Sequence, residues 1–253
     1  MLNPAQLARP GIARILDAVL PPRCLKCGGL IEPAGGGSGG ALCPACWQGL
    51  AFLGPPHCAC CGLPFEFDLG ANALCAQCAT APPPFARARA VLRYNEASRD
   101  LILAFKHADR TESAPTFANW LARAGAELVG DCQVIAPVPL HWSRLFHRRY
   151  NQAALLAQAL GRLSDRPVVP QLLVRRRATA PQGHKGRLAR QRNIAGAIAV
   201  SPRLAEGIAG RRILVIDDVI TTGATAAASA KALLMAGAKA VDILALAQVV
   251  RSD

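Results

Sequence analysis

The spacing of the cysteines constrains the fold of this chain more than any other feature. Nine of the ten cysteines lie between Cys24 and Cys78, and eight of these nine form four Cys-x-x-Cys pairs. Two residues between thiolates allow a tight turn to present both sulfurs to one tetrahedral Zn²⁺, at Zn–S distances of about 2.3 Å. Two pairs complete one structural site, so the sequence predicts two sites. The eight predicted zinc ligands are Cys24, Cys27, Cys43, Cys46, Cys58, Cys61, Cys75 and Cys78.

Redox dithiols and disulfides are the alternatives for these pairs, and the repetition of one spacing favours zinc over both. The simplest grouping is sequential, with the first two pairs on one ion and the last two on the other. The spacing also permits a cross-braced grouping, and His57 or Cys60 could replace a ligand. Cys132 lies far along the chain and is predicted to be a small buried hydrophobic residue. A Cys₄ zinc site has no open coordination position, so this region is predicted to be a scaffold or a binding surface.

The chain is expected to contain two domains, because its 253 residues are enough for one α/β domain and a smaller additional domain. The proline-rich stretch Ala81–Pro84 follows the last cysteine pair and marks a boundary. We therefore predict a zinc-binding module, a double zinc ribbon, over residues 1–82. The second domain is predicted over residues 83–253.

Composition excludes wholesale disorder, because 52% of the residues are hydrophobic and can bury a core. The sequence contains neither a long uninterrupted apolar stretch nor the pattern of a secretory signal, so we expect a cytoplasmic protein without a transmembrane segment. Lys and Arg number 29 against 16 acidic residues, a formal charge of +13. This excess can attract phosphate, nucleic acid or an anionic membrane surface.

Apolar segments of alternating strand and helix character follow the proline-rich stretch. Near-continuous apolar runs suit a parallel sheet that is covered on both faces, and Ala/Leu-rich segments between them suit crossover helices. The second domain is therefore predicted to be α/β, with a mainly parallel sheet and flanking helices. The predicted strands are Val134–Ala136, Ile213–Ile216 and Val241–Leu246, and the predicted helices are Asn151–Leu163, Thr225–Met235, Leu101–Lys106 and Phe117–Val129.

The run Ile213–Thr225 carries the strongest functional signal. A predicted buried strand leads to two carboxylates, Asp217 and Asp218, and ligands of open α/β sheets bind at that end of the strands. Backbone N–H groups of Thr221, Thr222, Gly223, Ala224 and Thr225, at the start of a helix, form a concave set of donors for a phosphate. The acids would repel a phosphate, so they suit two sugar hydroxyls of the same ligand. The alternative is a solvated strand end followed by an ordinary helix N-cap.

This run resembles the phosphoribosyl pyrophosphate (PRPP) motif of type I phosphoribosyltransferases. The resemblance implies that Asp217 and Asp218 meet the ribose hydroxyls, and that Thr221, Thr222, Gly223, Ala224 and Thr225 hold the 5′-phosphate. Further segments resemble a narrower group, the ComF-type competence protein family, which couples an N-terminal zinc module to a phosphoribosyltransferase-like domain. These segments are Val91–His107, Pro137–His141 with Arg148–Gln152, and Arg177–Gln182 with Arg190–Asn193.

Within this resemblance, Pro137, Val138 and Pro139 shape the pyrophosphate site, and Mg²⁺ accompanies PRPP. Two positions depart from the pattern. Arg149 stands where many members of the family have glycine. Thr221 stands where 6-oxopurine salvage enzymes carry an aspartate that acts as general base, which lowers support for purine salvage.

Positive charge is concentrated in two segments, Arg144–Arg149 and Arg175–Arg192. Arginines there could clamp the pyrophosphate of PRPP, or could be solvated loop charges. A third interpretation is a nucleic-acid track, in which Trp142, Phe146 and Tyr150 stack on bases. The sequence shows no partner for the histidines of this region, and it assigns no catalytic residue.

Two functions are therefore expected from the sequence. The first is a PRPP-binding, phosphoribosyltransferase-like protein that transfers phosphoribose to an unidentified acceptor with Mg²⁺. The second is a non-catalytic factor that handles single-stranded DNA in natural transformation, as the family resemblance implies. Purine or pyrimidine salvage is a weaker third. The sequence specifies neither the acceptor, the DNA partner nor the oligomeric state.

Overall fold

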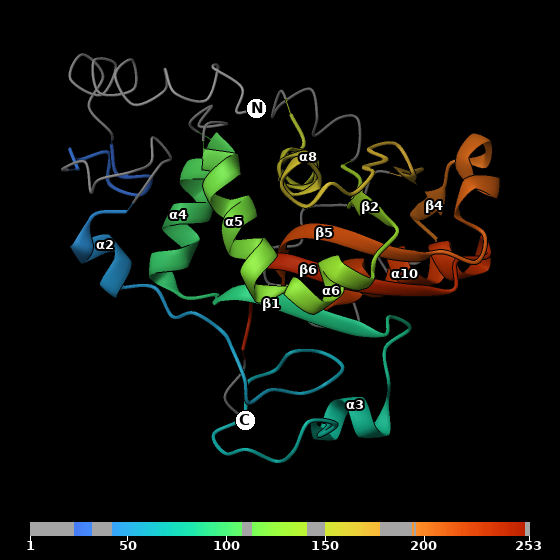
Figure 1. Ribbon diagram of the computed structural model, residues 1–253, viewed down its shortest axis with the longest axis horizontal. Helices are drawn as coiled ribbons and strands as arrows, with labels where there is room; N and C mark the ends of the chain where they lie inside the picture. Colours follow the sequence, from blue (N-terminus) through green and yellow to red (C-terminus); the bar gives the residue numbers. More distant parts are fainter. Residues whose placement is uncertain are drawn as a thin grey trace, which may run out of the picture.

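The computed structural model describes residues 23–31, 42–107, 113–140, 150–177, 194 and 196–250. Its centre is a four-stranded parallel sheet in the order β1-β6-β5-β2 (Figure 1). The strands are β1 (Arg87–Arg93), β2 (Val134–Pro137), β5 (Arg212–Ile220) and β6 (Ala240–Gln248). Two short strands, β3 (Leu173–Arg175) and β4 (Ile198–Val200), form a separate antiparallel pair.

Helices cover both faces of the sheet, as the crossovers of a parallel sheet require. The helices of the second domain are α4 (Glu96–His107), α5 (Ala114–Ala124), α6 (Ala126–Asp131), α8 (Gln152–Ser164) and α10 (Ala224–Met235). Helices α4, α5, α6 and α8 contribute to one apolar core together with Leu214 and Leu244 of the sheet (Figure 1). Helix α10 contributes to a second core with Val215 and Ile243, which lie on the other face. Two short 3₁₀ helices, η3 (Pro202–Leu204) and η4 (Glu206–Ile208), precede β5.

The three strands predicted from apolar runs are present as β2, β5 and β6, and all are parallel. β6 is buried along nearly its whole length, which explains why its sequence shows no polar alternation. Helix α8 begins after Asn151, whose side chain accepts a hydrogen bond from the Ala153 N–H (3.1 Å) and so caps the helix. The α/β prediction with a mainly parallel sheet is therefore confirmed.

One predicted helix is wrong in its extent. The segment Phe117–Val129 was expected to be continuous, but the structure divides it into α5 and α6 at Gly125. A Cβ at position 125 would lie 2.7 Å from both Cδ atoms of Leu244 in β6. Glycine therefore lets the chain approach the sheet closely at this point, and the helix breaks there.

Strand β1 was not predicted, because arginines alternate with apolar residues along it. Two of these arginines are held by acids. Arg87 bonds to the fully buried Asp242 at 2.8 Å, and Arg89 bonds to Glu127 at 2.7 Å. Charged side chains are common on sheet edges, where they limit pairing with other chains.

The zinc-binding module is docked on the β1 edge by backbone hydrogen bonds. The Leu53 N–H donates to the Val91 carbonyl and the Arg93 N–H donates to the Ala51 carbonyl, both at 2.8 Å. The Ala88 N–H donates to the Cys60 carbonyl at 2.6 Å, further along the same strand. The module contains two short helices, α2 (Pro44–Gln48) and α3 (Ala76–Thr80); Figure 1 shows α2 to the left of β1, beside α4, and α3 below β1.

None of the helices in the described ranges is long and apolar enough to cross a membrane.

Candidate functional site

Three predicted parts of the phosphate site lie at one end of the parallel sheet. Strand β5 continues beyond the predicted end at Ile216 to Ile220, so Asp217 and Asp218 lie within its last residues. A turn over residues 221–223 then leads into α10. Gly223 has φ +74° and precedes the first residue of that helix, a left-handed conformation that favours glycine. This turn and the helix N-terminus behind it supply N–H groups of the kind that bind phosphate.

The predicted pyrophosphate segment lies directly beside this strand. Pro137 is the last residue of β2 and pairs with Ile216. The Val138 N–H donates to the Ile216 carbonyl at 2.9 Å, which brings Pro139 to the same edge of the sheet. The Asn151 side chain donates to the Val138 carbonyl at 2.9 Å, so the start of α8 supports this segment.

The two carboxylates differ in their electrostatic environment. Burial, together with the negative charge of Asp218, raises the pKa of Asp217 well above its ordinary value. Burial also opposes ionisation of Asp218, but the charge and hydrogen bond of Lys106 hold the pKa of Asp218 below its ordinary value. Each carboxylate accepts the N–H of the next residue, at 2.8 Å for Asp217 and 2.7 Å for Asp218. Of the two carboxyl groups, Asp218 is therefore the one that ionises more readily.

Lys106 is a site residue whose role the sequence did not indicate. Its ammonium forms an ion pair with Asp218, and only 15% of its side chain is exposed. The Gln152 side chain, which is buried at the start of α8, donates to the Lys106 carbonyl at 3.3 Å. The sequence placed Lys106 in a segment with family resemblance, but nothing in the local pattern pointed to an acid on β5.

Most of the basic segments lie outside the described residues. These include His141–Arg149 and residues 178–193, with the predicted aromatic residues Trp142 and Phe146. Arg175, the first residue of the second basic segment, is the last residue of β3.

The cysteines form two clusters of four, and the grouping is sequential. Cys24, Cys27, Cys43 and Cys46 form the first, and Cys58, Cys61, Cys75 and Cys78 form the second; within each, the sulfur atoms all lie within 4.8 Å of one another. The sulfurs of Cys27 and Cys43 are 3.9 Å apart, and those of Cys61 and Cys75 are 3.7 Å apart. Tetrahedral zinc with Zn–S bonds of about 2.3 Å spaces sulfurs by about 3.8 Å, whereas a disulfide needs about 2.05 Å.

The two clusters also share a hydrogen-bond pattern that favours thiolates. The Cys43 N–H donates to the Cys24 sulfur at 3.5 Å, and the Cys75 N–H donates to the Cys58 sulfur at 3.3 Å. Burial opposes ionisation of both sulfurs, but these and neighbouring N–H donors lower the pKa of Cys24 to about 6 and of Cys58 to about 7. The residues present therefore fit two structural Zn²⁺ sites.

The remaining cysteines and His57 do not join either cluster. Cys60 lies beside the second cluster, and burial raises its pKa. Cys132 is fully buried and donates weakly to the Val129 carbonyl (3.4 Å), as expected for a small core residue. Gly28 and Gly62, which follow the first pair of each cluster, have φ of +74° and +70°.

The parallel sheet, the acid–threonine–glycine turn at its end and the two cysteine clusters define a phosphoribosyltransferase-like protein with an N-terminal double zinc ribbon. The family model described as "Double zinc ribbon domain" matches residues 15–81. "DNA utilization protein YhgH" of Escherichia coli K12 is 33% identical over 195 residues, which cover 75% of this chain and 82% of that protein. "Competence protein F" of Haemophilus influenzae is 29% identical over 231 residues, covering 89% and 96%. The chain belongs to the ComF-type competence protein family.

Solved phosphoribosyltransferases are also similar to this chain. Orotate phosphoribosyltransferase from Aeropyrum pernix is 17% identical, with a TM-score of 0.35, over 63% of this chain and 68% of that one.

Proposed function

We propose that the edge of the sheet formed by β2, β5 and the start of α10 binds PRPP. The observation that carries this proposal is the meeting of Asp217 and Asp218, the Gly223 turn and the Pro137–Pro139 segment at one end of the sheet. Carboxylates accept hydrogen bonds from sugar hydroxyls, and the N–H groups of residues 221–225 donate to the 5′-phosphate. A single phosphoribose ligand thus uses both the hydrogen-bond acceptors and the hydrogen-bond donors of the site.

Asp217 and Asp218 would hold the ribose, and Pro137, Val138 and Pro139 would shape the position of the pyrophosphate. Mg²⁺ bound together with PRPP would supply positive charge that offsets the negative charge of the pyrophosphate. The Lys106 ammonium balances the charge of Asp218. Because Thr221 replaces a carboxylate base, the acceptor must bring an acidic or already nucleophilic group.

Calorimetry with PRPP and Mg²⁺ tests this proposal on the full chain. Gly223→Val adds a branched side chain where the phosphate must approach the backbone, and we expect it to abolish the binding heat while the circular dichroism spectrum stays unchanged. Gly210→Val is the matched control, since Gly210 has φ +70° and nothing within 4 Å of its Cβ position, as for Gly223 with φ +74°. If the two variants bind PRPP equally well, the β5–α10 turn does not hold the phosphate. Release of pyrophosphate with candidate acceptors then tests transfer.

A second candidate function is the handling of single-stranded DNA during natural transformation. It is favoured by the names of the relatives, "Competence protein F" and "DNA utilization protein YhgH", and by the formal charge of +13. In this function PRPP is a regulator or a vestigial ligand, and not a substrate. Displaced counterions make nucleic-acid affinity fall steeply with salt, so retention of single-stranded DNA that ignores salt would exclude this function.

We also propose that each cysteine cluster holds one structural Zn²⁺, within a module of residues 1–82 that precedes the phosphoribosyltransferase-like domain of residues 83–253. The zinc would stabilise a segment with little apolar core of its own.

A further inference from the structure

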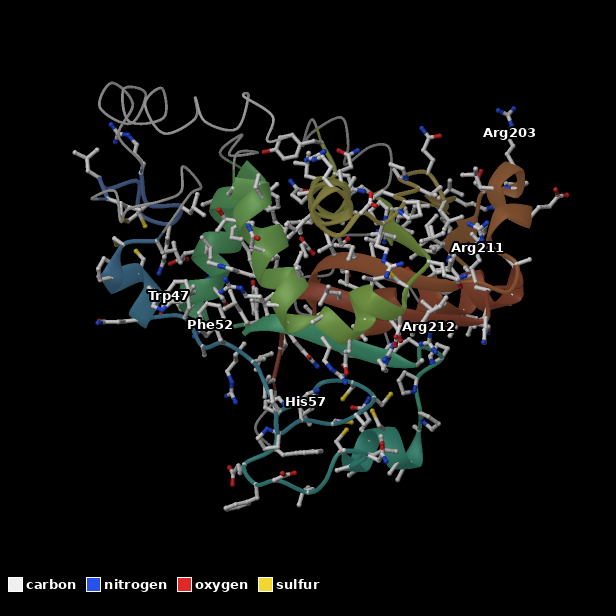
Figure 2. The ribbon with its side chains drawn as sticks, in the orientation of Figure 1. Trp47, Phe52, His57, Arg203, Arg211 and Arg212 are labelled. Atoms are coloured by element: carbon white, nitrogen blue, oxygen red, sulfur yellow. The ribbon has the colours of Figure 1, made fainter. Side chains whose placement is uncertain are left out.

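A hollow of about 390 Å³ lies between the zinc-binding module and the second domain, away from the β5–α10 turn. Its walls come from the end of α2, the segment that follows it, strand β1 and helix α5. The aromatic residues of its lining are Trp47, Phe52 and Trp120. Figure 2 shows Trp47 and Phe52 close together where α2 leads toward β1.

The three rings are fixed in mutual contact. The ring centroids of Trp47 and Phe52 are 4.9 Å apart, and both rings meet Trp120 nearly edge-on, at 5.8 and 5.6 Å. Trp120 in turn contacts Phe117, a core residue, at 5.5 Å. This series of contacts anchors the cluster in the interior, so its rings are held in place before any ligand arrives.

Much of this rigid aromatic surface is nevertheless accessible. Trp47 is 47% exposed and Phe52 is 44% exposed. Large aromatic rings normally bury their surface, and a group of exposed rings in a hollow is typical of a binding site. The flat rings favour a ligand that is itself flat and aromatic.

The charged residues around the hollow favour binding of an anion on one side of it. Arg123 lies in the last turn of α5 and lines the hollow, and it forms no hydrogen bond or ion pair with any part of the chain that the structure describes. Arg89 also lines it, but its guanidinium is held by Glu127 at 2.7 Å and by the Ala59 carbonyl at 3.1 Å. The adjoining hollow, which shares Arg89, is lined by Glu127 and Asp68. An anionic group is therefore favoured beside Arg123 and disfavoured beyond Arg89.

We propose that this hollow binds a base of single-stranded DNA, which stacks on Trp47 and Phe52 while its phosphate lies beside Arg123. Stacked aromatic rings with an adjacent cation are the combination by which proteins bind unpaired bases without reading their sequence. An apolar peptide segment would use the rings but not the unpaired arginine. This inference rests on the second candidate function and gives that function a site.

Fluorescence anisotropy with a labelled oligothymidylate of about a dozen nucleotides tests the proposal on the zinc-loaded full chain. We expect Trp47→Ala and Phe52→Ala each to weaken binding roughly 5- to 150-fold, the range that follows from about 1–3 kcal/mol for loss of one stacked base. Trp47→Phe should retain most of the affinity. Phe67→Ala is the matched control, because Phe67 is 75% exposed but does not line the hollow. Zinc content and the circular dichroism spectrum show whether each variant is folded.

The charge is tested separately. A plot of log affinity against log salt concentration falls with a negative slope. Arg123→Ala should make this slope less steep by about 0.7, the value of one phosphate contact to a single strand. Arg203→Ala is the control, since Arg203 is exposed at the opposite end of the molecule (Figure 2).

The outcomes separate this site from the function on which it rests. If the unchanged chain does not bind the oligonucleotide, both the second candidate function and the site are wrong. If the chain binds it, but Phe52→Ala weakens binding no more than Phe67→Ala, the function stands and the site is wrong. If a labelled apolar peptide binds the chain, binds Phe52→Ala more weakly than Phe67→Ala, and is not displaced by oligothymidylate, the hollow belongs to a protein partner and the proposal is overturned.

Discussion

Gly62→Ala should detach the second cysteine cluster from the β1 edge. Gly62 has φ +70°, and a Cβ at this position would lie 2.6 Å from the carbonyl oxygen of Ala88. That oxygen belongs to the backbone of β1 and cannot rotate away, so the loop must move. The movement would break or lengthen two bonds that hold the loop, from the Ala88 N–H to the Cys60 carbonyl (2.6 Å) and from the Gln248 side chain to the Cys61 carbonyl (3.2 Å).

The magnitude follows from these contacts. A residue other than glycine in the left-handed region costs about 1–2 kcal/mol, and each lost hydrogen bond costs about 0.5–1.5 kcal/mol. We therefore expect Gly62→Ala to lower the free energy of unfolding by about 2–5 kcal/mol. Gly70→Ala is the control within the same module, because Gly70 has φ +92° but nothing within 4 Å of its Cβ position. It should cost only the conformational part, about 1–2 kcal/mol.

Urea denaturation of both variants at one free zinc concentration measures the difference, with tryptophan fluorescence as the signal. Hydrogen exchange at the Ala88 amide gives a local measurement, since this N–H bonds directly to the loop. Its exchange should accelerate in Gly62→Ala and not in Gly70→Ala. Equal stability of the two variants, with unchanged exchange at Ala88, would refute the argument that backbone contact at Gly62 docks the cluster.

Two further predictions concern the acids and the zinc. The raised pKa of Asp217 means that its contribution to stability is present below the ordinary aspartate pKa of about 3.9 and is lost as pH rises through the raised value. Asp217→Asn does not titrate, so it should have the higher Tm at about pH 8, with the difference shrinking toward about pH 4; a constant difference in calorimetric scans would contradict this. Cys58→Ser should lower the zinc content from two ions per chain to one, whereas Cys60→Ser, outside both clusters, should leave two by elemental analysis.

The parts of the fold that were predicted correctly depend on local patterns. β5 and β6 are buried in the middle of a parallel sheet, so their sequences are apolar runs that identify them without knowledge of their neighbours. β1 could not be recognised in this way, because whether Arg87 belongs in a strand depends on Asp242, far along the chain. Gly125 after Arg123 is a local helix-stop signal, but the contact with Leu244 that requires glycine at this position depends on the tertiary structure.

The same distinction between local patterns and contacts of distant residues applies to the candidate sites. The sequence predicted both cysteine pairs of each cluster, and the acids and turn residues of Asp217–Thr225, because the chemistry proposed for them requires a short, fixed spacing along the chain. The ion pair of Lys106 with Asp218 could not, because a lysine near the end of a helix has no pattern that names its partner.

The amino-acid sequence alone determined that the chain has two cysteine clusters, a buried parallel sheet and an acid–threonine–glycine turn, since each of these is set by residues close together in the chain. Only the tertiary structure decided which side of the sheet carries the module, which cation faces Asp218, and that Trp47, Phe52 and Trp120 meet in one hollow. The physical reason is that packing and electrostatic contacts act over a few ångströms in space, without regard to separation along the chain.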